Sequence, residues 1–243
     1  MKILVLGAAS RIGPYVVDAL EADHELLLTD VIDVESDHAS RRVDISSLDE
    51  VTDAMQGMDA VINCTVERRD RQRAFDVNTL GCYHVMRAAV DTGVRRVINT
   101  GPHFTVQGPS YEGFDYGIEP DAPSHPGVNL YAHSKGIGQE ICRVFAENND
   151  LHVLMLLFYI FRADDDKVFN HPHLISWEDS AQAVRCAIDV DLATMPSRCE
   201  VFSILCEQPH RRFSNKKARY FLGWEPKDDL SRHWTRRSVE GGE

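Results

Sequence analysis

Short apolar runs alternate with amphipathic stretches of helical length along the whole chain, and this alternation constrains the fold more than any other feature. The apolar, strand-like runs occupy residues 3–6, 26–30, 60–64, 97–100, 152–157 and 200–205. The helical stretches occupy residues 12–20, 48–55, 75–92, 130–148, 178–190 and 215–222. Strands that are apolar throughout are buried on both faces, and helices that connect successive strands make a sheet parallel. The sequence therefore predicts an α/β fold with a doubly wound parallel sheet.

A glycine-rich turn, Gly-Ala-Ala-Ser-Arg-Ile-Gly, joins the first strand to the first helix. Gly7 and Gly13 permit a tight turn and let a pyrophosphate approach the backbone N–H groups at the start of the helix. Ser10 stands where a glycine is more usual, and we expect this small hydrogen-bond donor to be tolerated. With Arg11 and Ile12 these residues form a predicted phosphate-binding turn, which makes the expected fold Rossmann-like and dinucleotide-binding.

Asp30 ends the second strand and favours NAD over NADP. A carboxylate there accepts hydrogen bonds from the adenosine ribose and repels a 2′-phosphate. The alternatives are a capping or turn aspartate, and Arg11 is a counter-signal because it can bind a phosphate; we give Asp30 the greater weight. Asp44 and Ile45 are candidates to cover the adenine, although Asp44 is almost as well explained as a cap of the helix at residues 48–55.

Tyr131 and Lys135 form a Tyr-x-x-x-Lys pair inside a predicted helix. Residues four apart on a helix share a face. A free tyrosine titrates near pH ~10, and a neighbouring ammonium group lowers that pKa by favouring the phenolate. Together with the glycine-rich turn, the pair predicts a general base beside a bound nucleotide.

The chain length and two long loops suggest how this site is organised. Its 243 residues, 43% of them hydrophobic, suffice for one large core. We expect an NAD-binding domain over residues 1–160 and a small substrate-binding lobe over residues 161–243, interwoven with the first. The loop at residues 101–129 is rich in Gly, Pro, Tyr and His, which favours an ordered active-site wall; a second, charged loop spans residues 162–172.

Motifs spread over nearly the whole chain resemble the extended short-chain dehydrogenases/reductases of the epimerase/dehydratase family. The matching pieces are GAASRIG, TD at Asp30, VDI at Asp44, DVNTLGCYHVMRAA around Asn78, GVRRVINT, YAHSK, ISWEDSAQAV and FLGWEP. Within that family the chain is most similar to the compact uronate or aldose dehydrogenases, which share the short C-terminal part and a Trp followed by an acidic pair, here beginning at Trp177.

The resemblance implies a role for several residues. Tyr131 exchanges a proton with the substrate hydroxyl, and Lys135 binds the nicotinamide ribose and lowers the Tyr131 pKa. Asn78 holds the long helix and the proton relay, and Cys64 lines the adenine side of the cofactor. Members of the family often dimerise through their two long middle helices, here residues 75–92 and 130–148, so we expect a homodimer.

Two departures from the family pattern concern the substrate side. A Ser or Thr is expected after the strand at residues 97–100 to hydrogen-bond the reacting oxygen, and Thr100, Thr105 and His103 are all candidates, with Thr105 or His103 favoured. After the strand at residues 152–157 an arginine is usual, but this chain has Phe158-Tyr159, which points to an unusual pocket or impaired oxyanion stabilisation.

Histidines and acids in the loops are candidate metal ligands. His171 and His173 are separated by one residue, but no third ligand has suitable spacing. In the compact-dehydrogenase interpretation they lie near the substrate carboxylate or hydroxyl groups. The three consecutive acids at residues 164–166 do not converge on one ion. We therefore predict no metal.

Composition narrows the partners and the location. The net charge of −12 argues against nucleic acid or an anionic membrane. Six cysteines without a Cys-x-x-Cys pair suggest reduced, mostly buried thiols of a cytoplasmic protein. The N-terminus lacks the pattern of a signal peptide, and no apolar stretch reaches the ~18 residues of a membrane span.

Three functions are compatible with these features. The leading hypothesis is an NAD-dependent oxidoreductase acting on a small sugar-like or polyol substrate, with Tyr131 as general acid/base. A sugar or nucleotide-sugar epimerase or dehydratase would use the same tyrosine and retain the cofactor, but usually needs a larger C-terminal part. A catalytically impaired NAD-binding regulator is the third, suggested by the ambiguous Ser/Thr position.

Overall fold

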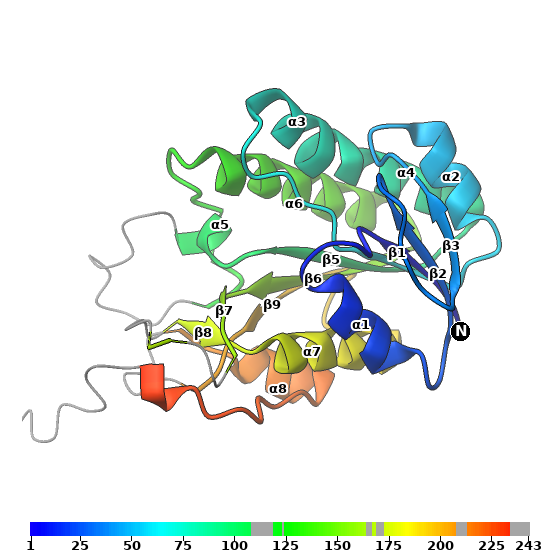
Figure 1. The fold of residues 1–243 in the computed structure, drawn as a ribbon. Coiled ribbons are helices and arrows are strands. Elements are labelled where there is room, and N and C mark those ends of the chain that lie inside the picture. Colours follow the sequence, from blue (N-terminus) through cyan, green and yellow to red (C-terminus); the bar gives the residue numbers. More distant parts are fainter. Residues whose placement is uncertain (108–118, 123, 164–166, 169–172, 208–212, 234–243) are drawn as a thin grey trace, which may run out of the picture.

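The computed structural model describes residues 1–107, 119–122, 124–163, 167–168, 173–207 and 213–233, and a seven-stranded sheet lies at its centre (Figure 1). Its strand order is β3-β2-β1-β4-β5-β6-β9, and each neighbouring pair is parallel. The strands are β1 (Lys2–Leu6), β2 (Glu25–Asp30), β3 (Ala39–Arg42), β4 (Ala60–Asn63), β5 (Arg96–Pro102), β6 (His152–Phe158) and β9 (Cys199–Ile204). The predicted doubly wound, Rossmann-like sheet is confirmed.

Helices cover both faces of this sheet (Figure 1). One layer holds α2 (Leu48–Met55), α4 (Gly81–Thr92) and α6 (Leu130–Asn148), and the other holds α1 (Gly13–Leu20), α7 (Trp177–Asp189) and α8 (Lys216–Leu222). Side chains alternate between the faces of a strand. In β1, Ile3 and Val5 pack in the core under α1 and α7, whereas Leu4 and Leu6 pack in the core under α2 and α4. Both faces are therefore buried, as the apolar runs predicted.

The expected single helix at residues 75–92 is interrupted. The structure has α3 (Arg71–Phe75), a π-helical segment (Asp76–Leu80) and then α4. A π-helical turn inserts one residue into the helical repeat and often occurs at functional sites. This interruption could not be predicted from the spacing of apolar residues, which indicated one helix over residues 75–92.

Several short elements also escaped the sequence pattern. The strand β3 has four exposed residues and hence no apolar run. A short helix, α5 (Phe104–Gln107), follows β5 inside the predicted loop, and β7 (Ile160–Phe161) pairs with β8 (Leu174–Ile175) in a separate two-stranded sheet. Because β9 pairs with β6, the segment after residue 160 supplies an edge of the main sheet. The proposed division at residue 160 stays a prediction.

The C-terminal part is fixed to α7 through a buried tryptophan. Trp224 has no exposed surface, and its indole Nε1 donates a hydrogen bond of 2.9 Å to the Asp179 carbonyl. The Asp179 carboxylate accepts hydrogen bonds from the backbone N–H groups of Lys227 and Asp228. The FLGWEP and WED motifs therefore stabilise each other.

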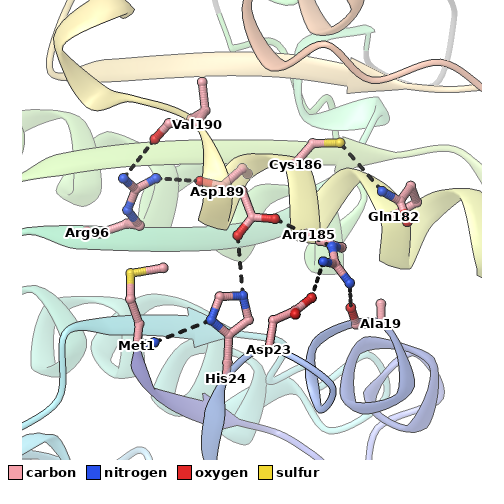
Figure 2. A network of polar contacts seen from close by, with 11 residues as sticks. Met1, Ala19, Asp23, His24, Arg96, Gln182, Arg185, Cys186, Asp189 and Val190 are labelled. Atoms are coloured by element: carbon pink, nitrogen blue, oxygen red, sulfur yellow. Dashed lines mark hydrogen bonds and ion pairs between the residues drawn. The ribbon is translucent and has the colours of Figure 1, made fainter.

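A polar network joins the N-terminus to the end of α7 at the amino edge of the sheet (Figure 2). His24 Nε2 lies 3.3 Å from an Asp189 carboxylate oxygen, and Arg185 pairs with Asp23. Arg96 donates hydrogen bonds of 2.8 Å to the carbonyls of Ala187 and Val190. The last carbonyls of a helix lack partners within the helix, so Arg96 caps α7.

Within the part of the chain described here, no helix has the length and apolar character needed to cross a membrane.

Candidate active site

The carboxyl ends of β1, β4, β5 and β6 meet at one edge of the sheet, where a cavity of about 960 Å³ opens. In open α/β sheets, ligands bind in the crevice where connections from neighbouring strands leave toward opposite faces, here between β1 and β4. In the described part of the chain, the cavity is lined by the glycine-rich turn and the start of α1, the loop after β4, the end of β5 and the start of α5, the start of α6, and the chain from β6 to α7. Their lining residues include Ser10, Arg11, Ile12, Tyr15, Cys64, Glu67, Arg68, Arg69, Thr100, His103, Phe104, Tyr131, Lys135, Phe158, Tyr159, Phe161, Arg162 and Trp177.

The glycine-rich turn has the geometry of a pyrophosphate cradle. Gly7 has a φ of +80°, and a Cβ atom there would lie 2.7 Å from the Thr65 backbone nitrogen. A Cβ atom at Gly13 would lie 1.9 Å from the Ala8 carbonyl oxygen. The hydroxyl of Ser10 is buried and has no hydrogen-bond partner in the described part of the chain. An unpaired buried hydroxyl is costly, and a phosphate oxygen would satisfy it, so this turn fits a dinucleotide.

The predicted adenosine-side residues lie around this turn. Asp30 accepts hydrogen bonds from the backbone N–H groups of Ala9, at 3.1 Å, and of Val31, at 2.8 Å. It therefore shapes the turn, and it lies beside the cavity lining rather than in it.

Asp44 and Ile45 also stand outside the lining. The Asp44 carboxylate accepts hydrogen bonds from the backbone and hydroxyl of Ser46, and these bonds lower its pKa. Ile45 is buried against Gly81. Cys64 does line the cavity; burial raises the pKa of its thiol to about 12, so the thiol stays protonated.

Tyr131 and Lys135 project from the first turns of α6, which Asn129 caps by accepting a hydrogen bond from the Ala132 N–H. The Lys135 side chain is buried, and its Nζ donates to the carbonyls of Thr65, at 2.8 Å, and Thr100, at 3.2 Å. Burial lowers the pKa of this ammonium. It bridges the carboxyl ends of β4 and β5, and one of its three N–H donors remains for a ligand.

The Tyr131 ring lies between an aromatic and a cationic side chain. The centroid of the Phe104 ring is 5.8 Å from that of Tyr131, and the Arg68 guanidinium carbon lies 5.1 Å from the Tyr131 centroid. Burial raises the pKa of the Tyr131 phenol, and the positive charge of Arg68 opposes that rise.

Asn78 connects the π-helical segment to both the loop after β4 and α6. Its Oδ1 accepts a hydrogen bond of 3.1 Å from the Glu67 backbone N–H. Its Nδ2 donates to the Glu67 carbonyl at 2.7 Å and to the Ser134 hydroxyl at 3.0 Å. The predicted relay role of Asn78 stays a prediction; in the structure its amide clamps the peptide that precedes Arg68.

The three candidates for the Ser/Thr position differ in what their side chains contact. Thr100 Oγ1 donates to the Asn63 carbonyl at 2.8 Å, and Thr105 Oγ1 donates to the Pro102 carbonyl at 3.0 Å. Each hydroxyl therefore commits its one proton to the backbone, and Thr105 lies outside the cavity lining. His103 lines the cavity and stacks on Tyr159, with 4.3 Å between ring centroids. Its Nδ1 lies 3.2 Å from the Phe158 carbonyl, so Nδ1 donates its proton to that carbonyl.

His173 forms a layer behind His103. Its ring centroid lies 6.4 Å from that of His103 and 4.2 Å from that of Phe213, and it is buried. It is not part of the cavity lining. His171 lies outside the described residues, as do residues 164–166.

Sequence reasoning singled out Arg11 but missed three other arginines that line the cavity, Arg68, Arg69 and Arg162. Arg68 and Arg69 lie in the loop that follows β4 at the carboxyl edge of the sheet, and this place in the chain was the signal that could have identified them. Arg162 lines the cavity four residues beyond Phe158, so a guanidinium reaches the pocket although the expected arginine position after β6 is not basic. The phenyl ring of Phe161 stacks on the Trp177 indole with centroids 4.0 Å apart, and together they form an apolar wall.

The parallel sheet, the glycine-rich turn and the paired Tyr131 and Lys135 around one cavity define a dinucleotide-dependent oxidoreductase of the short-chain type. A family model described as "NAD dependent epimerase/dehydratase family" matches residues 3–160. The chain belongs to that family, and NAD is the family's cofactor, as Asp30 predicted.

Individual relatives agree with the predicted resemblance. L-arabinose 1-dehydrogenase (NAD(P)(+)) from Haloferax volcanii is 23% identical, over 94% of this chain and 97% of its own. A short-chain dehydrogenase/reductase superfamily protein from Agrobacterium tumefaciens, crystallised with NAD, superposes with a TM-score of 0.81 at 18% identity, over 96% and 94% of the two chains. Uronate dehydrogenase from the same organism superposes with a TM-score of 0.78 at 20% identity, over 93% of this chain and 84% of its own. The similarity to compact uronate and aldose dehydrogenases is confirmed.

Proposed function

We propose that this protein is an NAD-dependent dehydrogenase that oxidises a hydroxyl group of a small sugar-like substrate, with Tyr131 as the general base. The observation that carries the proposal is the single cavity that brings Tyr131 and Lys135 together with the glycine-rich turn. When bound, NAD supplies the acceptor for the hydride. The phosphate cradle would hold it through the turn amides and the Ser10 hydroxyl, and Asp30 would meet the adenosine ribose.

Each residue around Tyr131 has a task in this reaction. Tyr131 Oη as phenolate takes the proton of the substrate hydroxyl. The remaining N–H of Lys135 orients the ribose on the nicotinamide side. His103, which lines the same cavity, would position the substrate beside Tyr131.

The charge of the wall bears on the substrate class. The chain has a net charge of −12, yet among the described residues four arginines and one lysine line the cavity against one glutamate, Glu67. Such a local excess of positive charge favours an anionic ligand. Among sugar-like substrates we therefore favour uronates over neutral aldoses.

NADH formation with a panel of uronates and aldoses tests the proposal, with Tyr131→Phe as the control. Turnover with a sugar acid that the substitution abolishes is the expected result. Interconversion of sugars without net formation of NADH would show that the protein is an epimerase and not a dehydrogenase.

A catalytically impaired NAD-binding regulator remains the second candidate. It is favoured by the engagement of both threonine hydroxyls, of Thr100 and Thr105, with backbone carbonyls. Tight NAD binding without turnover on the panel, unaffected by Tyr131→Phe, would support it.

We also propose a cytoplasmic homodimer. Apolar side chains are exposed along the layer of α4 and α6, namely Phe75, Leu80, Tyr83, Ile137 and Val144, and the rings of Tyr83 and Phe145 contact each other across the two helices. Burial of this surface against a second copy would remove it from water. Sedimentation should give a dimer that Tyr83→Glu dissociates, whereas the control Tyr220→Glu, on the exposed face of α8, should leave it intact.

A further inference from the structure

A second cationic side chain, that of Arg68, lies beside the ring of Tyr131. The family resemblance assigns the stabilisation of the phenolate to Lys135. In the structure the Lys135 Nζ donates to two backbone carbonyls, those of Thr65 and Thr100. The Arg68 guanidinium carbon lies 5.1 Å from the ring centroid of Tyr131, and its positive charge opposes the rise in the pKa of the phenol that burial causes.

A hydrogen-bond network holds the backbone of Arg68 in this position. The Glu67 carboxylate accepts hydrogen bonds from the backbone N–H groups of Arg68 and Arg69, both at 2.7 Å. The Glu67 peptide is in turn bound on both sides by Asn78, which also binds Ser134 of α6. Through Asn78, the helix α6 therefore fixes the backbone of the loop that carries Arg68. From this loop the Arg68 side chain reaches the ring of Tyr131, on the same helix.

We propose that Arg68 is a positioning residue that stabilises the Tyr131 phenolate in addition to Lys135. The proposal rests on the proposed function of Tyr131 as a base. A guanidinium stays charged at any working pH, so its effect on the phenolate does not change with pH. Arg68 is exposed to solvent in the structure, which weakens its field. A substrate and cofactor that fill the cavity would exclude water and strengthen it.

Other charged and titratable groups face the same space and must be separated from Arg68. The loop after β4 contributes Glu67 and Arg69, the end of β5 contributes His103, α6 contributes Lys135, and the segment after β7 contributes Arg162. Substitution of Arg68 alone, with an arginine outside the cavity as the control, distinguishes its contribution from the general loss of one positive charge in this part of the chain.

The test compares Arg68→Gln, Arg68→Lys and Arg71→Gln. Arg71 begins α3 and is exposed, outside the cavity lining, so it matches the charge change without the contact. The first readout is the titration of Tyr131 by NMR of Cζ-¹³C-labelled tyrosine, with Tyr131→Phe to assign the signal. In Arg68→Gln the Tyr131 titration should move to higher pH, and Arg68→Lys should restore part of the shift. This readout needs neither NAD nor substrate, so it decides the inference even if turnover is never found.

The second readout is the pH profile of kcat/KM for NADH formation with the best sugar acid. Loss of a charge this close should leave roughly tenfold less phenolate at neutral pH and lower kcat/KM by the same factor, with the acid limb displaced to higher pH. Arg71→Gln should change neither the pH at which Tyr131 titrates nor the position of the acid limb of the kcat/KM profile. A Tyr131 titration that is the same in the wild-type protein and in Arg68→Gln would overturn the proposal. A rise in KM without displacement of the limb would overturn it too, and would make Arg68 a substrate-binding residue instead.

Discussion

Asn78 and Ser134 are joined by a hydrogen bond of 3.0 Å between Nδ2 and Oγ, although they lie 56 positions apart in the chain. The bond ties the π-helical segment to α6. Because Asn78 also binds both backbone groups of Glu67, one buried amide sets the relative position of the loop after β4 and the helix of Tyr131.

Asn78→Ala should therefore destabilise the protein strongly. The substitution leaves the half-buried N–H and carbonyl groups of Glu67 without their hydrogen-bond partner. We therefore expect the free energy of unfolding, measured by urea denaturation, to fall by about 2–3 kcal/mol. Ser134→Ala removes only one of the three bonds and should cost about 1 kcal/mol. Equal losses in the two variants would mean that the clamp on Glu67 contributes nothing.

Gly13→Ala should damage NAD binding more than stability alone explains. The added Cβ atom would overlap the Ala8 carbonyl, at 1.9 Å, so the phosphate turn must change shape. We expect NAD affinity, measured by calorimetry, to fall roughly tenfold or more, a loss of about 1.4 kcal/mol or more in binding free energy.

Gly57→Ala is the matched control for that substitution. Unlike Gly13, Gly57 has a positive φ, of +71°, and a Cβ atom there meets nothing within 4 Å. It should cost about 1 kcal/mol of stability from backbone strain and leave NAD affinity unchanged. If both variants bind NAD like the wild-type protein, the turn is not the phosphate site.

Patterns that repeat along the chain allowed the fold and the Tyr131–Lys135 pair to be predicted. Runs such as Ile3 to Leu6 are apolar because both faces of β1 are buried, and burial leaves a direct mark on sequence. The spacing of Tyr131 and Lys135 is local to one helix. What depends on a single helix or strand was therefore predictable.

Features that depend on contacts between distant segments of the chain could not be predicted from the sequence. The position of Arg68 is set by Asn78 and Glu67 acting together, and neither leaves a periodic signal. The open choice among Thr100, Thr105 and His103 has a similar origin. The strand β5 extends to Pro102, two residues past the predicted end, so Thr100 lies within the sheet and its hydroxyl meets the neighbouring strand at Asn63.

The oxidation rate should rise with pH. Tyr131 must lose its proton to act as base, and burial raises its pKa, so only a small fraction is phenolate at neutral pH. Below that pKa, kcat/KM for NADH formation should increase about tenfold for each pH unit. The reverse reaction, in which the protonated phenol is the acid, should not gain from alkaline pH. A flat forward profile from neutral to alkaline pH would show that another group accepts the proton.

Arg96→Met should lower stability without touching the active site. Arg96 begins β5 at the amino edge of the sheet, away from the carboxyl edge where the cavity opens, and it donates to two carbonyls at the end of α7 (Figure 2). Methionine keeps much of the apolar stem but leaves these carbonyls without donors, which should cost about 1–3 kcal/mol.

Arg95→Met provides the comparison for Arg96, because Arg95 only pairs with Asp150 and both side chains of that ion pair are well exposed. Exposed pairs contribute little, so this variant should unfold at nearly the wild-type urea concentration. NAD affinity should be unchanged in both. A drop in NAD affinity confined to Arg96→Met would mean that the end of α7 is coupled to the cavity through the helix, whose first residue, Trp177, lines it.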